Sequence, residues 1–260
     1  MTVDGTALVT GASAGIGRAL SVEFAANGHD VALVARREDE LRALADRLED
    51  DHDVSAHVLA KDLATRDAPG ELYEETEARD IEVDVLVNNV GIGTQGGFVD
   101  NDPGRELDQL QLNVVTPTQL THRFGGDMAD RGRGGILSVA STAAWFPGPF
   151  VAIYYASKAY MKTFSEGIAE ELRPEGVDVT VLCPGPVDTE FQARADNEDT
   201  LLGSGEMQDV EMVASAGYGG LQDGETVVVT GWKYELLTKL SGVLPSRLKR
   251  NSAKNLNTSE

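Results

Sequence analysis

The sequence has few cysteines, few basic residues and no long apolar run. Its one cysteine, Cys183, rules out an internal disulfide, so a reducing cytoplasm is the expected location. No segment approaches the roughly 18 consecutive apolar residues that span a bilayer. We also expect no secretory leader, because Met1–Gly5 leads directly into a strand-like segment.

The sequence has few residues of the types that bind metals or act as nucleophiles, and their spacing does not suit such chemistry. Histidines number 4, and none joins a carboxylate cluster with metal-ligand spacing, so we expect no metal site. Cys183 follows the apolar run Val177–Leu182, which predicts a space-filling thiol rather than a catalytic one.

Acidic residues greatly outnumber basic ones, 43 against 22, giving a formal charge of −21. Such a surface repels nucleic acid phosphates, so general DNA or RNA binding is excluded. One interpretation is a well-solvated, soluble surface. The favoured one is a halophilic acidic surface, in which molar salt screens the repulsion between carboxylates. A melting temperature that rises with molar KCl supports the second interpretation, whereas greatest stability in dilute buffer contradicts it.

Short apolar runs alternate with amphipathic stretches along the chain. Because the runs lack clean polar alternation, they predict strands buried on both faces. The fold class predicted is α/β: a Rossmann-type, doubly wound, seven-stranded parallel sheet with helices on both faces, in a single domain. The expected strands are Ala7–Val9, Val31–Ala35, Val54–Leu59, Val83–Val87, Gly135–Val139, Val177–Leu182 and Thr226–Thr230.

The amphipathic stretches predict the covering helices, and the rest divides into a main domain and a tail. Residues 1–231 form the expected domain, with a polar segment, 190–223, as its substrate lid. Residues 232–260 form a C-terminal extension. The expected helices are Ile16–Asn27, Glu38–Asp50, Glu71–Arg79, Arg105–Ala129 and Ala152–Arg173.

A glycine-rich turn follows the first strand and opens the first helix. It reads Thr10-Gly11-Ala12-Ser13-Ala14-Gly15-Ile16-Gly17. Gly11 permits a tight turn, while Gly15 and Gly17 let backbone approach a pyrophosphate and let helix approach sheet. This pattern predicts a dinucleotide site.

The end of the second strand distinguishes NAD from NADP. In NAD enzymes an acidic residue usually stands at this position and binds the ribose 2′-hydroxyl. Here the position is Ala35, and Arg36 and Arg37 follow it. Two guanidinium groups suit a 2′-phosphate, and Ser13 can add a hydrogen bond. NADP is therefore the expected cofactor, although both arginines also suit the exposed start of a helix beside Glu38.

Tyr154 and Lys158 stand one helical turn apart, downstream of Ser141, as in an acid/base centre. With the glycine turn, they make residues 5–230 resemble the classical short-chain dehydrogenase/reductase family. The other matching segments are Asp62-Leu63, Asn88-Asn89-Val90-Gly91, Asn113 and Pro184–Thr189. Val90 departs from the alanine that is usual in the family.

The resemblance implies a role for each matching residue. Tyr154 is the general acid or base, Lys158 favours its phenolate and holds the nicotinamide ribose, Ser141 binds the substrate oxygen, and Asn113 anchors a proton-relay water. Tyr155 is the alternative candidate for the catalytic tyrosine, but it is three residues from Lys158 and out of step with Ser141. The cofactor-binding set is Thr10, Gly11, Ser13, Ala14, Gly15, Ile16, Gly17, Arg36, Arg37, Asp62, Leu63, Asn89, Gly91, Tyr154, Lys158, Pro184, Gly185, Val187 and Thr189.

The function expected is NADP-dependent interconversion of a carbonyl and a secondary alcohol by hydride transfer, on a small, apolar substrate. The aromatic residues of Trp145–Phe150 either line the pocket or only pack their loop. The resemblance implies a homodimer or homotetramer that pairs through the helices around Arg105–Ala129 and Ala152–Arg173. The alternative is a nucleotide-sensing protein on the same fold, which commonly lacks the tyrosine or lysine.

The tail differs in charge from the rest of the chain. Residues 232–254 carry Glu235 as their only acidic residue, among Lys233, Lys239, Arg247, Lys249, Arg250 and Lys254. Leu236, Leu240 and Leu244 are spaced to share a helical face. A basic amphipathic segment of this kind docks on the acidic body, joins subunits or rests on an anionic membrane, and a protein contact is the favoured reading.

Overall fold

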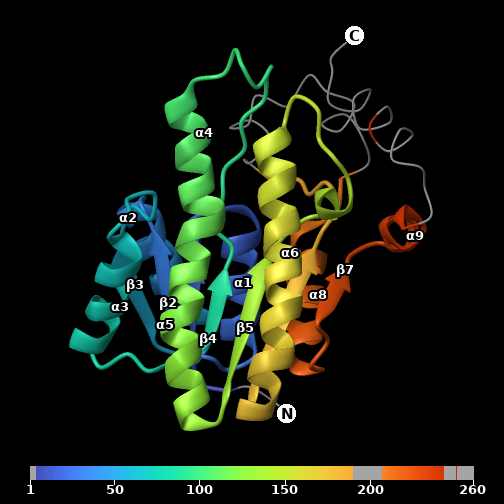
Figure 1. Ribbon diagram of the computed structural model, residues 1–260. Helices are drawn as coiled ribbons and strands as arrows, with labels where there is room; N and C mark the ends of the chain where they lie inside the picture. The colour runs from blue at the N-terminus through green and yellow to red at the C-terminus, as the bar shows by residue number, and fades with distance from the viewer. Residues whose placement is uncertain (1–3, 190–206, 243–249, 251–260) are drawn as a thin grey trace.

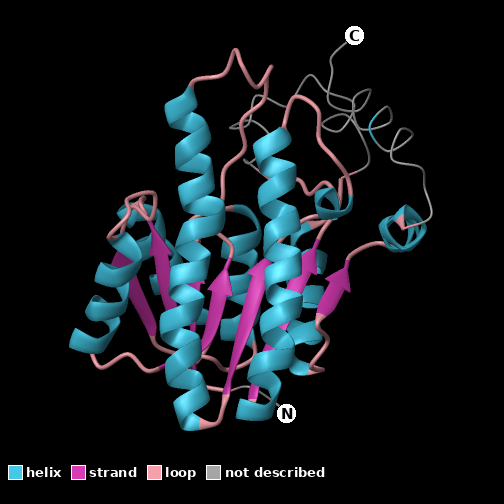
Figure 2. Ribbon diagram, viewed as in Figure 1, coloured by secondary structure: helices cyan, strands magenta, loops and turns pink. Residues whose placement is uncertain are grey.

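The computed structural model describes residues 4–189, 207–242 and 250. Its centre is one parallel sheet in the order β3-β2-β1-β4-β5-β6-β7, with helices on both faces (Figures 1 and 2). All seven expected strands are confirmed. Their bounds are β1 Thr6–Thr10, β2 Val31–Ala35, β3 Ala56–Ala60, β4 Val83–Asn88, β5 Gly134–Val139, β6 Val177–Cys183 and β7 Val227–Val229.

The helices form two layers with separate apolar cores. Phe24 of α1, Leu44 of α2 and Val213 of α8 are buried against one face of the sheet. Leu72 of α3 and Phe124 of α5 are buried against the other. The helices are α1 Gly15–Ala26, α2 Glu38–Asp51, α3 Ala68–Ala78, α4 Pro103–Leu110, α5 Thr116–Arg131, α6 Ala152–Leu172, α8 Val210–Gln222 and α9 Trp232–Ser241, with short turns η1 Gln111–Val115, η2 Thr142–Trp145 and η3 Arg173–Glu175.

The helix expected over Arg105–Ala129 is divided by η1, a π-helical turn. Pro117 supplies the reason, because it has no N–H to donate to the carbonyl of Asn113 in a regular α-helix. Asn113, an expected site residue, lies in this turn. Wider turns of this kind occur frequently at functional sites.

Part of the segment expected to form a substrate lid, residues 190–223, is a helix of the main fold. Residues 190–206 lie outside the described residues, but 210–222 form α8, which packs against α1. Its glycines hid this helix from sequence reasoning, since glycine is a weak helix former. In the fold they allow close packing, because a Cβ on Gly217 would lie 2.8 Å from the Leu182 side chain.

The order of the strands in the sheet determines where a ligand-binding crevice forms. Val9 of β1 lies between Leu33 of β2 and Val87 of β4. The chain therefore leaves β1 on one side and returns as β4 on the other, which creates a crevice at the carboxyl ends of these strands. Open α/β sheets bind ligands at such a switch point.

Candidate active site

The glycine turn after β1 has the backbone shape that only glycine adopts readily. Gly11 and Gly15 have φ of 71° and 53°. A Cβ on Gly11 would lie 2.7 Å from Nδ2 of Asn89, and one on Gly17 would clash with the Gly11 carbonyl. Ala14 gives α1 no side-chain cap, so the first N–H groups of the helix are not satisfied by a capping residue. A helix start of this kind suits a phosphate group.

Thr10 and Asn89 hold this turn against the end of β4. Thr10 Oγ1 accepts hydrogen bonds from the backbone N–H of Asn89 (2.9 Å) and of Val90 (3.1 Å). Asn89 Nδ2 donates to the Thr10 carbonyl at 2.8 Å. Thr10 and Gly17 are buried behind the groove surface, so they shape the cradle rather than line it.

Arg37 reaches back over the glycine turn. Its Nη2 lies 3.2 Å from both the carbonyl oxygen and Oγ of Ser13, and its Nε lies 3.3 Å from that Oγ. Arg36 extends the other way, with Nη1 4.0 Å from a carboxylate oxygen of Asp62. Both side chains of this pair are more than half exposed, so the ion pair adds little stability. The expected arginines and Asp62 therefore line one end of the crevice.

Ser141 and Tyr154 meet at the other end. The Tyr154 hydroxyl hydrogen-bonds to Ser141. Ser141 also begins η2, where its Oγ accepts from Ala143 N–H at 3.1 Å. Because this cap holds the serine side chain in place, its oxygen is directed at the phenol.

Lys158 is buried beneath Tyr154. Its Nζ lies 5.7 Å from the centre of the Tyr154 ring and donates to the Val139 carbonyl at 2.9 Å. Gly91 lies between Lys158 and Asn113. A Cβ on Gly91 would lie 3.7 Å from the Lys158 Nζ and 3.2 Å from the Asn113 Oδ1. The four expected catalytic residues are thus brought together.

Asn113 is fixed from two directions. Its Nδ2 donates to the Ile92 carbonyl at 2.9 Å and to Ser157 Oγ at 3.2 Å, and its Oδ1 accepts from Ile92 N–H at 3.0 Å. Ser157 in turn donates to the Tyr154 carbonyl at 2.7 Å. Ser157 is therefore a positioning residue that sequence reasoning missed, because a buried serine on a helix gives no signal of its own.

Burial shifts both titrating groups toward their neutral forms. It raises the pKa of Tyr154 to about 12, against a smaller lowering by the hydrogen bond from Ser141. It lowers the pKa of Lys158 to about 8. Burial is the largest cause of both shifts, because a charged phenolate or ammonium loses solvation there, and the role expected of Lys158 in favouring the phenolate stays a prediction.

Packing bears on the expectations for three further residues, Tyr155, Trp145 and Cys183. The Tyr155 ring lies over Gly148, where an added Cβ would clash, so this tyrosine packs on the loop before α6, and it also lines the groove. Trp145 lies beside Lys162, with the Lys162 Nζ 4.9 Å from the centre of the Trp145 ring, and packs on a small core rather than lining the crevice.

Burial raises the pKa of Cys183 to about 12, which makes its thiol inert near neutral pH.

The segment after β6 is held by residues far away in the chain. Gln208 N–H donates to the Pro186 carbonyl at 2.8 Å, and its side chain donates to the Thr230 carbonyl at 2.7 Å. The ring of Tyr234, in α9, covers Gly185, where a Cβ would lie 2.6 Å from Cε2. Sequence reasoning missed Tyr234 because only the fold brings the tail to this segment.

Together these residues line one elongated groove of about 690 Å³. It runs from Arg36 and Arg37, past the glycine turn, to Tyr154 and Lys158. The glycine cradle and the two-ended layout fit an extended dinucleotide, with its phosphates at the start of α1. The remaining expected cofactor residues that line it are Ser13, Ala14, Ile16, Asp62, Leu63, Gly91, Pro184, Gly185, Val187 and Thr189.

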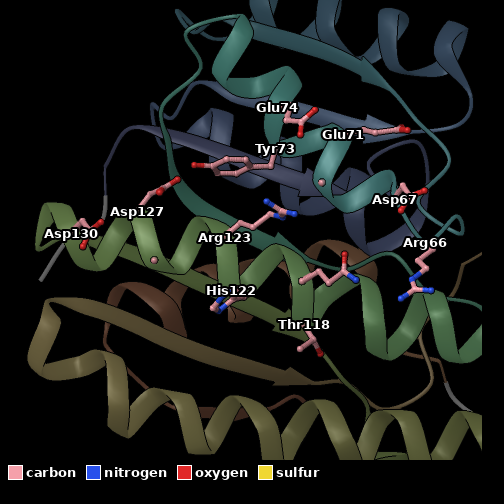
Figure 3. A pocket seen from close by; sticks show the side chains of 13 residues that line it. Arg66, Asp67, Glu71, Tyr73, Glu74, Thr118, His122, Arg123, Asp127 and Asp130 are labelled. Carbon is pink, nitrogen blue, oxygen red and sulfur yellow. The ribbon is translucent and has the colours of Figure 1, made fainter.

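A larger and more open hollow, of about 1040 Å³, lies between α3 and α5 (Figure 3). Arg123 lies over the ring of Tyr73, 5.6 Å from its centre, and the Tyr73 hydroxyl bonds to Asp127. No glycine turn or catalytic residue of the groove borders this hollow. Size alone therefore does not identify the site, and the expected catalytic residues lie at the groove.

The described part of the chain contains neither a membrane-spanning helix nor a metal-binding cluster. No helix there is long and apolar enough to cross a membrane. No group of three or more His, Cys, Asp or Glu residues there is placed to hold a metal ion.

The sequence profile described as short chain dehydrogenase matches residues 5–200. The chain belongs to the short chain dehydrogenase family. This short chain dehydrogenase is 38% identical over 197 residues to one from Pseudocercospora fijiensis, covering 75% of this chain but only 63% of that protein. It is 33% identical over 255 residues to 11-beta-hydroxysteroid dehydrogenase-like 4A of Arabidopsis thaliana, covering 94% and 83%.

A solved structure extends the likeness to the whole chain. The short-chain dehydrogenase of Sphingobium yanoikuyae, in complex with NADPH, has 30% identity and a TM-score of 0.84, with 95% of each chain covered. The fold described above is therefore shared with this solved structure.

The contact between Gly185 and Tyr234 yields a test of how α9 supports the cofactor segment of this short chain dehydrogenase. We expect Gly185→Ala to weaken NADPH binding about tenfold, because its new methyl group pushes against the tyrosine ring and shifts the backbone. Gly185→Ala with Tyr234→Ala should regain most of the affinity in fluorescence titrations. Gly219→Ala is the matched control, since its added Cβ meets nothing within 4 Å. A double variant as weak as the single one contradicts the assignment.

Proposed function

We propose that the chain is an NADP-dependent oxidoreductase that interconverts a carbonyl and a secondary alcohol. The observation that carries this proposal is the meeting, in one groove, of the glycine turn at one end with Ser141, Tyr154 and Lys158 at the other. When bound, the nicotinamide supplies or accepts the hydride. The chain itself moves the proton and binds the substrate oxygen.

The proton chemistry favours carbonyl reduction near neutral pH. A Tyr154 pKa of about 12 keeps the phenol protonated, so it is ready to donate to an alkoxide as that forms. Ser141 donates a second hydrogen bond to the same oxygen, where negative charge develops. Alcohol oxidation needs the phenolate, so its rate should rise with pH above neutrality.

NADP is favoured over NAD by the groups at the far end of the groove. Arg37 and Ser13 contact each other and both line the groove, while Arg36 lies beside Asp62. A 2′-phosphate placed there would receive charge-assisted hydrogen bonds. The likeness to a family member in complex with NADPH supports the same choice.

The substrate proposed is a small, apolar carbonyl compound. Beside Tyr154, the groove is lined by the apolar side chains of Ile92, Leu112, Ala143 and Val151, and the charged residues Arg105 and Asp108 line the groove as well. The hydroxysteroid dehydrogenase name of the Arabidopsis thaliana relative is consistent with an apolar carbonyl.

We also propose a homodimer or homotetramer in a reducing, salt-rich cytoplasm. Leu107 of α4, Val115 of η1 and Tyr160 of α6 are exposed on the helices expected to pair, by 66%, 37% and 37%. Light scattering in molar KCl reports the mass, and a monomer there contradicts the pairing.

The first experiment is fluorescence titration with NADPH and NADH, followed by a panel of carbonyl compounds with the preferred cofactor. Tight NADPH binding with turnover supports the enzyme. Tight binding without turnover of any compound favours the alternative, a nucleotide-sensing protein. Preference for NADH contradicts the role given to Arg36 and Arg37.

A further inference from the structure

Helix α4 and the turn after it border the groove with two charged residues and one apolar residue. Arg105, Asp108 and Leu112 all line it. They stand three and then four residues apart, so they form one stripe along α4 and η1, the α4 stripe. Arg105 lies in the first turn of α4, and this end of the helix lies beyond the carboxyl edge of the sheet (Figure 1).

The α4 stripe leads to the catalytic end of the groove. Leu112 directly precedes Asn113, one of the four expected catalytic residues. Helix α4 also packs against α6, whose first turn carries Tyr154. Arg105 and Tyr154 therefore lie beyond the same edge of the sheet and line the same groove.

Arg105 differs from other arginines of this acidic chain in having no ion pair. No carboxylate of the described residues lies within 4.0 Å of its guanidinium nitrogens. By contrast, Arg42 pairs with Glu38 and Arg133 pairs with Glu82. The charge of Arg105 is thus left available to a molecule in the groove.

Two acidic residues close to Arg105 in sequence are occupied elsewhere. Asp102 caps α4, where its carboxylate accepts from the backbone N–H of Gly104 at 2.6 Å. Glu106 is buried, and its carboxylate accepts from Thr94 Oγ1 at 2.9 Å and from Asn101 Nδ2 at 2.6 Å. These hydrogen bonds hold both carboxylates away from the exposed guanidinium.

The position of Arg105 also opposes the stability of its own helix. The positive end of the helix dipole lies at the first turn of α4, where a basic residue is unfavourable. Neither helix stability nor an ion pair therefore accounts for this arginine. The guanidinium and the positive end of α4 would both attract an anion that enters the groove.

The proposed cofactor has other sites for its own anionic groups. Its pyrophosphate fits the start of α1, and its 2′-phosphate fits Arg36 and Arg37 beside Ser13. An anion at Arg105 is therefore assigned to the other reactant, the carbonyl compound.

We propose that Arg105 determines substrate specificity by binding a carboxylate at the end of the substrate remote from the reacting carbonyl. This inference rests on the proposed function and narrows its substrate class to an oxo acid with an apolar chain. The planar guanidinium matches a carboxylate through two parallel hydrogen bonds. Leu112, Ile92 and Val151 would contact the chain between the two groups. Asp108 repels the same carboxylate and so limits its affinity.

The test is calorimetric titration of the full chain, saturated with whichever reduced cofactor binds more tightly, at one salt concentration. The probes are octanoate and octanamide, which share a chain length but differ in charge. We expect octanoate to bind more tightly, and Arg105→Gln to weaken octanoate about tenfold without changing octanamide. Asp108→Asn should strengthen octanoate a few-fold, because it removes a negative charge from the α4 stripe.

Arg66→Gln is the matched control. Arg66 is also exposed and without an ion pair among the described residues, but it lines the hollow between α3 and α5 rather than the groove. Its exchange removes the same charge from the same acidic protein. It should leave the affinities for both probes unchanged.

Each result decides for or against the role of Arg105. Equal affinity for octanoate and octanamide overturns the proposal, as does an Arg105→Gln variant that behaves like the control or weakens both probes equally. Weaker octanoate binding in Asp108→Asn overturns it as well, because the α4 stripe then binds a hydrogen-bond donor. A separate titration in which Arg105→Gln weakens the cofactor assigns the guanidinium to the cofactor instead. Neither probe has a reacting carbonyl, so failure of the proposed activity is a separate result, read as no cofactor oxidation by any carbonyl compound.

Discussion

Tyr154→Phe is expected to lower turnover by about 10²- to 10⁴-fold, the usual contribution of a positioned general acid. The phenol bonded to Ser141 is the proposed proton donor to the substrate oxygen. Phenylalanine keeps the ring that packs beside Tyr155 and Lys158 but removes that proton. Turnover is measured with NADPH and the best carbonyl compound of the panel.

The control is Tyr155→Phe, which makes the same change one residue later. Its ring packs over Gly148, so we expect turnover within a few-fold of wild type. Both variants should bind NADPH with nearly wild-type affinity, since neither removes a charge from the groove. A Tyr154→Phe protein that keeps wild-type turnover would falsify the assignment.

Exchanging Arg36 and Arg37 for glutamine should change the choice of cofactor. A hydrogen bond to a charged group contributes about 1.5–3 kcal/mol, so loss of one such bond weakens NADPH binding by about 10- to 100-fold. NADH lacks the 2′-phosphate, and its affinity should change little. Dissociation constants for both cofactors are measured by fluorescence titration at one fixed ionic strength.

Arg42→Gln provides the matched control. It removes one positive charge from α2, against two in the double variant; Arg42 pairs with Glu38 at 2.5 Å and lies outside the groove lining. It should leave both affinities unchanged. If the double arginine variant weakens NADH and NADPH equally, the arginines support the fold of the site rather than recognise the 2′-phosphate.

Much of the site could be predicted because its signals are local in sequence. The glycine turn has its strand, loop and helix within residues 6–26, and Tyr154 and Lys158 are one helical turn apart on α6. The strands could be found because each is a short apolar run, and β1, β2, β4, β5 and β6 are largely buried, a pattern set by the sheet itself. The arginines after β2 were found for the same reason, as they directly follow a recognisable strand.

Sequence reasoning fell short where a neighbour distant in sequence determines the structure. α8 was expected to be part of a lid, because its glycines weaken a helix locally, yet the same glycines let it pack on β6. Trp145 was open to a pocket reading until Lys162 and a small core were seen to hold it. The balance between burial and charge at Tyr154 and Lys158 also depends on what surrounds them.

By itself the sequence determined the order of the strands along the chain, the glycine turn at Gly11–Gly17 and the choice of candidate catalytic residues, because turn glycines and helical spacing act over a few residues. Only the tertiary structure decided that Gln208 and Tyr234, which lie far along the chain, hold the segment after β6. The physical reason is that packing brings together side chains far apart in the chain, and their contacts leave no periodic pattern in sequence.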